Sequence, residues 1–119
     1  MKQTQVNPEL INIIRQVHKK SIETKAAIWR KLAENLSKPK RRRIAVNLSR
    51  INRYTKAGET IVVPGKVLGT GKLNHPLKIA ALQFSEQAEQ KIAQAEGSCM
   101  TITELLKKHP KGSGIKIIG

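Results

Sequence analysis

Apolar residues recur at helical spacing through the first third of the chain, and this pattern predicts two amphipathic helices. The first covers residues 7–20, where Asn-Pro-Glu supplies a cap, a first-turn proline and a charge suited to the helix dipole. The second covers residues 24–36, and Pro39 prevents its continuation because the residue before a proline disfavours helical geometry. Both helices carry basic residues away from the apolar stripe, and we expect Trp29 to pack at the edge of the core.

The middle of the chain combines strand patterns with turn and helix signals. Aliphatic and β-branched runs predict strands over 44–48, 60–64 and 77–84. A further strand is expected to begin near Cys99, with that side chain buried as a small apolar group. Short helices are expected from a Ser49 cap to Thr55, from a Ser85 cap to Gly97, and from Thr103 to Lys108. We expect Gly65, Gly69 and Gly71 to form turns within the alternating segment 65–73.

These elements predict a single domain of the α/β class spanning residues 1–119. Its N-terminal part, residues 1–43, is helical and basic. Residues 44–110 form a mixed core of helices and strands, and residues 111–119 are expected to form a flexible tail after a Lys-Gly-Ser-Gly hinge.

Length and composition narrow the class of protein. A chain of 119 residues that is 39% apolar can form one modest core. It contains no apolar run near the ~20 residues of a membrane span, and its first residues lack the apolar stretch of a signal peptide. A single cysteine excludes an internal disulfide framework and suits a reducing compartment. We therefore expect a cytoplasmic protein.

The formal net charge of +15 predicts a polyanionic partner. Residues 1–56 hold fifteen basic and three acidic residues, and Lys38–Lys56 contains eight basic residues with no acid. Arg50 and Arg53 lie three residues apart on a turn of helix and face the same side. Nucleic acid is the polyanion that fits such a chain best. There are two alternatives. The basic residues could form a solvated face without a partner, or Lys40–Arg43 could be a nuclear localisation tract.

Catalytic, metal and nucleotide sites lack their required residues. Five residues separate Gly65 from Gly71-Lys72, where a P-loop has four, and Leu73 replaces its Ser or Thr. The chain contains no Asp, and its three His are scattered. We expect no catalytic residue, no metal, no cofactor and no small-molecule substrate. Aromatic residues make up only 3%, so we expect recognition of phosphates and shape rather than base stacking on a sheet.

Several motifs resemble a known ribosomal family. Glu34-x-Leu36-x-x-Pro39-Lys40-x-x-Arg43 followed by Val46-Asn47-Leu48-Ser49-Arg50-Ile51 resembles the signature of the archaeal and eukaryotic large-subunit ribosomal protein family eighteen-e, a sister of bacterial protein fifteen. Val63–Gly71 and Ala81–Ile92 are similar to the segments that the two families share. The C-terminal residues 115–119 are more apolar than the Arg-rich end of the family, and the short length is typical of archaeal members.

The resemblance implies a structural constituent of the large ribosomal subunit that binds ribosomal RNA beside neighbouring ribosomal proteins. It also implies an irregular superhelix of strand–strand–helix units preceded by helices. A DNA-binding chromatin or regulatory protein and a small RNA-processing enzyme are the alternatives. The expected RNA-binding residues are Lys38, Lys40, Arg41, Arg42, Arg43, Asn47, Arg50, Arg53, Lys56, Lys66, Lys72, Arg15, Lys19, Lys20, Arg30 and Lys111.

Overall fold

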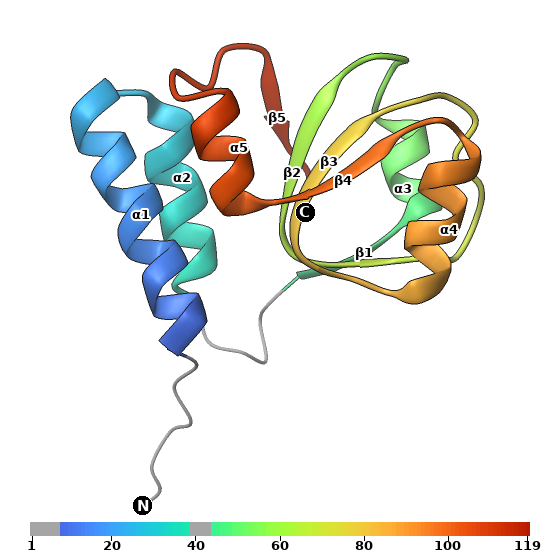
Figure 1. Cartoon of the computed structure of the whole chain (residues 1–119), viewed down its shortest axis with the longest axis horizontal. Helices are drawn as coiled ribbons and strands as arrows, with labels where there is room; N and C mark the ends of the chain where they lie inside the picture. The colour runs from blue at the N-terminus through green and yellow to red at the C-terminus, as the bar shows by residue number, and fades with distance from the viewer. Residues whose placement is uncertain (1–7, 39–43) are drawn as a thin grey trace, which may run out of the picture.

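A computed structural model describes residues 8–38 and 44–119 of the chain (Figure 1). The helices and strands follow one another as α1 (Pro8–Thr24), α2 (Ala27–Leu36), β1 (Ile44–Asn47), α3 (Leu48–Arg53), β2 (Thr60–Leu68), β3 (Lys78–Phe84), α4 (Glu86–Gln94), β4 (Ser98–Thr101), α5 (Ile102–Lys108) and β5 (Ile115–Ile117). The α/β class predicted from the sequence is confirmed. The expected strand, strand, helix order is present as β2, β3 and α4.

Every strand pairing in the sheet is parallel, and β2 is the strand on which the sheet is built. The order is β1-β2-β3-β4, with β5 also paired to β2. Residues 65–68 of β2 pair with β1, and residues 60–62 pair with β5. Because β3 occupies the opposite edge of β2 along most of its length, β1 and β5 share one edge end to end. A nine-residue strand therefore holds three neighbours in place.

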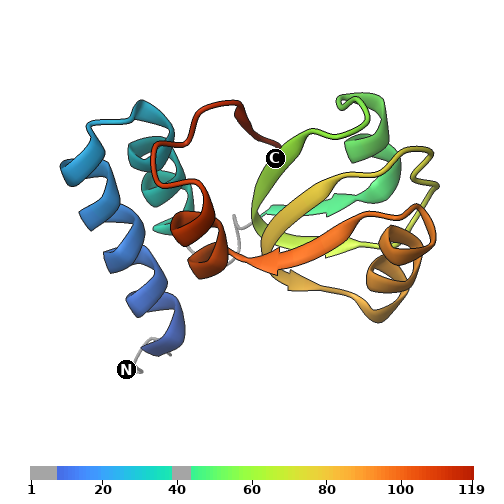
Figure 2. The ribbon, with the colours of Figure 1, turned by 45° about the horizontal axis from the view of Figure 1, so that its top comes forward.

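Helices cover both faces of this sheet (Figures 1 and 2). On one face, α3 and α4 pack against a core that includes Ile61, Val63 and Val67 of β2. On the other face, α1, α2 and α5 enclose a second core that includes Val62. Successive side chains of β2 therefore point into two separate cores, one on each face of the sheet. Trp29 lies fully buried in the second core rather than at its edge, and its Nε1–H donates to the Pro110 carbonyl at 2.7 Å.

The boundary between the first two helices differs from the prediction. The first helix continues past residue 20 to Thr24, whose hydroxyl donates to the Lys20 carbonyl at 2.8 Å. Lys25 then adopts a left-handed φ of 57° and ends the helix, so α2 begins only at Ala27. The turn depends on a residue type that rarely adopts positive φ, which explains why the sequence does not mark it. The predicted Asn7 cap lies outside the described residues.

The glycines expected to form turns have three different roles. Gly65 lies inside β2, which continues to Leu68, and the β2–β3 register shifts between Val63 and Lys66. Pro64 has no amide hydrogen to give to the ladder, and this accounts for the irregularity. Gly69 follows the strand in close contact with α4, where a Cβ would lie 2.7 Å from the Gln87 side chain. Of these three glycines, Gly71 alone has a left-handed φ, of 93°.

Helix caps were predicted correctly at one of the three short helices. Ser85 caps α4 as expected, and its hydroxyl accepts from the Ala88 amide at 3.1 Å. The first strand ends at Asn47, so Asn47 rather than Ser49 precedes α3. Thr101 caps α5 two residues before the expected start at Thr103, in a reciprocal capping box with Glu104. The hydrogen bond from the Thr101 amide lowers the pKa of Glu104.

The end of α4 and the C-terminal tail also differ from expectation. Glu96, with φ of 64°, ends α4, and Gly97 instead passes close to the backbone of Leu77. Residues 111–119 are not a flexible tail, because β5 pairs with β2 and Ile118 is only 5% exposed in the α3/α4 core. The sequence does not indicate this pairing, because the partner strand lies more than fifty residues earlier in the chain.

The contact between Gly71 and α3 generates a matched test. Gly58 and Gly71 share a left-handed φ, but a Cβ at Gly58 meets nothing within 4 Å, whereas at Gly71 it would lie 2.8 Å from the Ser49 amide nitrogen. We expect Gly58→Ala to lower the free energy of unfolding by about 1–2 kcal/mol from φ alone. Gly71→Ala should cost about 1–3 kcal/mol more, because it also overpacks the contact with α3. Urea denaturation of both variants measures the difference, and equal losses would contradict the contact.

The role of the tail is tested by removing one buried side chain. Ile118→Ala should lower the free energy of unfolding by about 2–4 kcal/mol, because it leaves a cavity in the α3/α4 core. Ile22→Ala, at a residue that is 64% exposed, is the matched control and should change stability by about 0.5 kcal/mol or less. Thermal or urea unfolding reports both values. A tail that does not belong to the folded core would make the two variants equally stable.

Candidate nucleic-acid interface

Two arginines of α3 converge on one exposed aromatic ring. The guanidinium carbon of Arg50 lies 5.2 Å from the centre of the Tyr54 ring, and that of Arg53 lies 5.9 Å from it. Tyr54 is 51% exposed, and both arginines are exposed. The predicted same-side placement of Arg50 and Arg53 is therefore confirmed. Guanidinium groups held at an aromatic ring lose less freedom when they bind a planar anion such as phosphate.

The loop between β2 and β3 runs beside α3 and is attached to it along its length. The Ser49 amide donates to the Thr70 carbonyl at 3.1 Å, and the Asn74 amide donates to Asn52 Oδ1 at 2.9 Å. Thr55 Oγ1 and His75 Nε2 lie 2.8 Å apart at the far end. These bonds hold the loop that carries the exposed Lys72 beside α3. We call Arg50, Arg53, Tyr54, Lys56 and Lys72 the α3 surface.

Lys91 stabilises the start of this loop from the other side. Its Nζ donates to the carbonyl oxygens of Gly69 and Gly71, at 2.6 and 2.8 Å. The ammonium therefore compensates two backbone carbonyls rather than an external anion. The sequence contained no signal for this role, because Lys91 lies on α4, twenty residues after the loop.

A second basic position lies on the sheet itself. Ala45, Lys66 and Gln83 pair across three neighbouring strands, and all three are exposed. Their neighbours Val46 and Val67 point into the α3/α4 core, so this row lies on the opposite face of the sheet. The half-buried Asn47 follows on the same face of β1. Lys66 is thus separated from the α3 surface by the thickness of the sheet.

The helical layer carries its own cations. Arg15 and Lys19 are exposed one turn apart on α1, and Lys20 forms a 3.6 Å ion pair with Glu23. A cleft of about 300 Å³ between α1 and α5 is lined by Lys19 and Lys20 together with Lys107, which the sequence analysis did not select. Arg30 on α2 and Lys111 after α5 are also exposed.

The structure therefore distributes the predicted cations over several surfaces. Lys38 is exposed just after α2, and the predicted residues Lys40, Arg41, Arg42 and Arg43 lie outside the described residues. Within the described ranges, ion pairs engage only Lys20 and Lys116 among the basic side chains. Lys116 forms an ion pair with Glu59 at 3.3 Å. The hydrogen bond that the Lys56 amide donates to Glu59 lowers the pKa of this carboxylate, and the nearby Lys116 ammonium lowers it further. The remaining exposed cations form no ion pair there.

Reactive and metal-binding groups do not gather in the described part of the chain. No three His, Cys, Asp or Glu residues of that part lie close enough to hold a metal ion. Cys99 is exposed on β4, so the predicted burial is wrong. Desolvation of its thiol and the nearby Glu89 raise the pKa of Cys99 to about 11, which keeps the sulfur protonated at neutral pH. No described helix is both long and apolar enough to cross a membrane.

The sequence of this chain matches a known protein family over nearly its whole length. The profile of the family described as "Ribosomal protein 60S L18 and 50S L18e" matches residues 6–119. The chain is 54% identical over 112 residues to the Large ribosomal subunit protein eL18 of Methanoregula boonei, covering 94% of this chain and 93% of that protein.

Two further relatives carry the same name. The protein from Archaeoglobus fulgidus is 48% identical over 112 residues, covering 94% of this chain and 96% of its own length. That from Methanothermobacter thermautotrophicus is 47% identical over 115 residues, covering 97% and 95%. The match extends over both helical layers and the sheet, so this chain belongs to the family of ribosomal proteins 60S L18 and 50S L18e.

Proposed function

We propose that this protein is a structural component of the large ribosomal subunit that binds and stabilises folded ribosomal RNA. Its family membership and the name of its archaeal relatives support the ribosomal assignment. The observation that carries the RNA-binding part is the α3 surface, where two exposed arginines contact one tyrosine ring and have no acidic partner among the described residues. The same proposal places the protein in the cytoplasm, beside neighbouring ribosomal proteins.

The mechanism is neutralisation of phosphate charge at fixed positions. Each phosphate that a Lys or Arg contacts releases condensed counterions, so folded RNA segments can approach one another closely. Arg50 and Arg53 suit phosphate because a guanidinium donates two parallel hydrogen bonds. The α3 surface lies on one face of the sheet, whereas Lys66 and the cations of α1 lie on the other. This arrangement fits a protein that lies between RNA segments. The sixteen residues expected to bind RNA, including Lys40–Arg43, are part of this proposal.

The salt dependence of binding tests the mechanism. If about six to ten phosphates are engaged, the logarithm of the affinity for large-subunit ribosomal RNA should fall against the logarithm of the salt concentration with a slope between roughly −4 and −9. Filter binding with a transcript of that RNA measures the slope, and duplex DNA is the competitor. A slope near zero, or preference for the DNA, would contradict the proposal.

The role of Tyr54 gives a more local prediction. We expect Tyr54→Leu to weaken RNA binding by roughly five- to thirtyfold, because both guanidiniums lose the ring that holds them, at about 0.5–1 kcal/mol for each exposed contact. Tyr54→Phe keeps the ring and should bind like the wild type. The salt slope should stay the same in both variants because no charge is removed.

Stability measurements separate this positioning role from a role in folding. Tyr54 is exposed, so the melting temperatures of both variants should match that of the wild type within a degree or two. Equal RNA affinity of the Leu and Phe variants would show that the ring does not position the arginines.

A further inference from the structure

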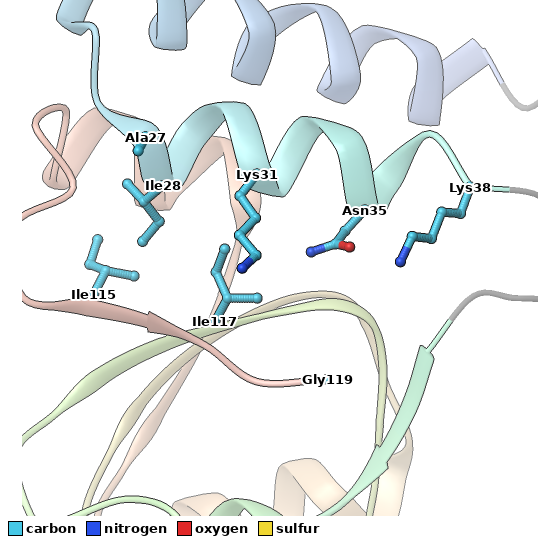
Figure 3. Close-up of a pocket in the computed structure, with 8 residues that line it drawn as sticks. All are labelled: Ala27, Ile28, Lys31, Asn35, Lys38, Ile115, Ile117 and Gly119. Atoms are coloured by element: carbon cyan, nitrogen blue, oxygen red, sulfur yellow. The ribbon is translucent and has the colours of Figure 1, made fainter.

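A groove between α2 and β5 combines an apolar floor with polar groups along one wall (Figure 3). Its volume is about 670 Å³, within the range of about 300–1,000 Å³ typical of small-molecule sites. The half-buried Ile28, Ile115 and Ile117 supply the apolar surface. The remaining described residues that line it are Ala27, Lys31, Asn35, Lys38 and Gly119.

The side chains of the polar wall have no ion-pair or hydrogen-bond partner among the described residues. Lys31, Asn35 and Lys38 follow one another along α2 and the residues after it, with the Asn35 amide between the two lysine side chains in Figure 3. Neither lysine forms an ion pair with another described residue. The half-buried Asn35 amide likewise forms no side-chain hydrogen bond in the described part of the chain. No acidic side chain is among the described residues that line the groove.

We propose that this groove binds a single unpaired adenine nucleotide of ribosomal RNA. The proposal rests on the proposed function and assigns one contact within it. The base would lie against the isoleucine side chains, and the Asn35 amide would accept from N6 and donate to a ring nitrogen. Lys31 and Lys38 flank the amide and would contact the phosphates on either side of the nucleotide.

Charge and hydrogen-bonding capacity favour a nucleotide over a protein segment. A carboxylate side chain would use the lysines and accept from the Asn35 amide nitrogen, but it would leave Asn35 Oδ1 without a donor. An adenine uses both the nitrogen and Oδ1 of this amide, on either of two edges, because its N6 amino group donates beside the acceptor N1 and beside the acceptor N7. Cytosine, guanine and uracil present such a pair on one edge only. The sequence also continues after Lys38 with four cations at Lys40–Arg43. Such a run of positive charge suits a polyanionic strand as the ligand. An apolar floor accepts a flat base without needing an aromatic residue.

Chemical probing of the complex tests this assignment. Large-subunit ribosomal RNA transcript, free and bound to the full-length protein, is treated with dimethyl sulfate, which reacts at adenine N1, and with diethyl pyrocarbonate, which reacts at N7. We expect the wild-type protein to protect at least one unpaired adenine that Asn35→Leu leaves reactive. Asn35→Leu should also weaken binding by roughly tenfold, within the range for one bidentate base contact.

Matched variants distinguish the groove from general RNA binding. Asn12→Leu, at an exposed residue of α1 away from the groove, should protect and bind like the wild type. Lys31→Ala should reduce the salt slope by about 0.7–0.9, whereas Asn35→Leu should leave the slope unchanged. A thermal melt of each variant confirms that it is folded before RNA is added.

The outcomes separate the two proposals. If the wild type binds with the expected slope but Asn35→Leu alters neither footprint nor affinity, the groove proposal is wrong and the proposed function stands. If the wild type shows no salt-dependent binding to ribosomal RNA, both are overturned. Protection of a guanine or pyrimidine alone, or cross-linking of the groove to a protein segment in assembled subunits, would also overturn the adenine assignment.

Discussion

The parallel pairing of β2 with three other strands is the constraint on which the rest of the structure depends. Ile61 and Val63 point into one core and Val62 into the other, so each helical layer packs against the same strand from opposite sides. Along one edge, β2 pairs with β5 over residues 60–62 and with β1 over residues 65–68, and along the other edge its register against β3 shifts between Val63 and Lys66. Loss of this strand would therefore separate both layers and release the tail, which is why the whole chain is expected to fold as one unit.

Local sequence signals predicted most of the elements. Several errors concern residues whose structure depends on contacts with distant parts of the chain. Helical spacing and the Ser85 cap located α1, α2 and α4, because these features depend on residues within two turns. The tail was misjudged because β5 is stabilised by Thr60–Val62, more than fifty residues earlier. Gly65 was assigned to a turn because glycine signals a turn locally, although here it pairs within a strand. Lys25 and Glu96 end helices with positive φ, which their residue types do not indicate.

The candidate site shows the same division between local and long-range information. Charge counting selected Arg50 and Arg53 correctly as neighbours, because their spacing on one helix is a local property. It could not show that both guanidiniums lie at the Tyr54 ring, or that Asn74 and His75 attach the loop carrying Lys72 to α3. Nor could it show that Lys91 binds backbone carbonyls of that loop. The scarcity of aromatic residues argued against base stacking. It did not indicate that the single tyrosine, Tyr54, would contact two arginine side chains.

The apolar tail connects stability with recognition. Because β5 forms one wall of the α2/β5 groove and also pairs with β2, the groove exists only while the tail remains in the sheet. An Arg-rich end would add phosphate contacts but would not supply Ile115 and Ile117 to the groove or Ile118 to the core. Under the nucleotide proposal, these three residues replace general phosphate contacts with one contact that depends on the shape of the groove. On this argument, weakening the core at Ile118 should also weaken the groove, so changes in the stability of β5 and changes in nucleotide protection should rise and fall together.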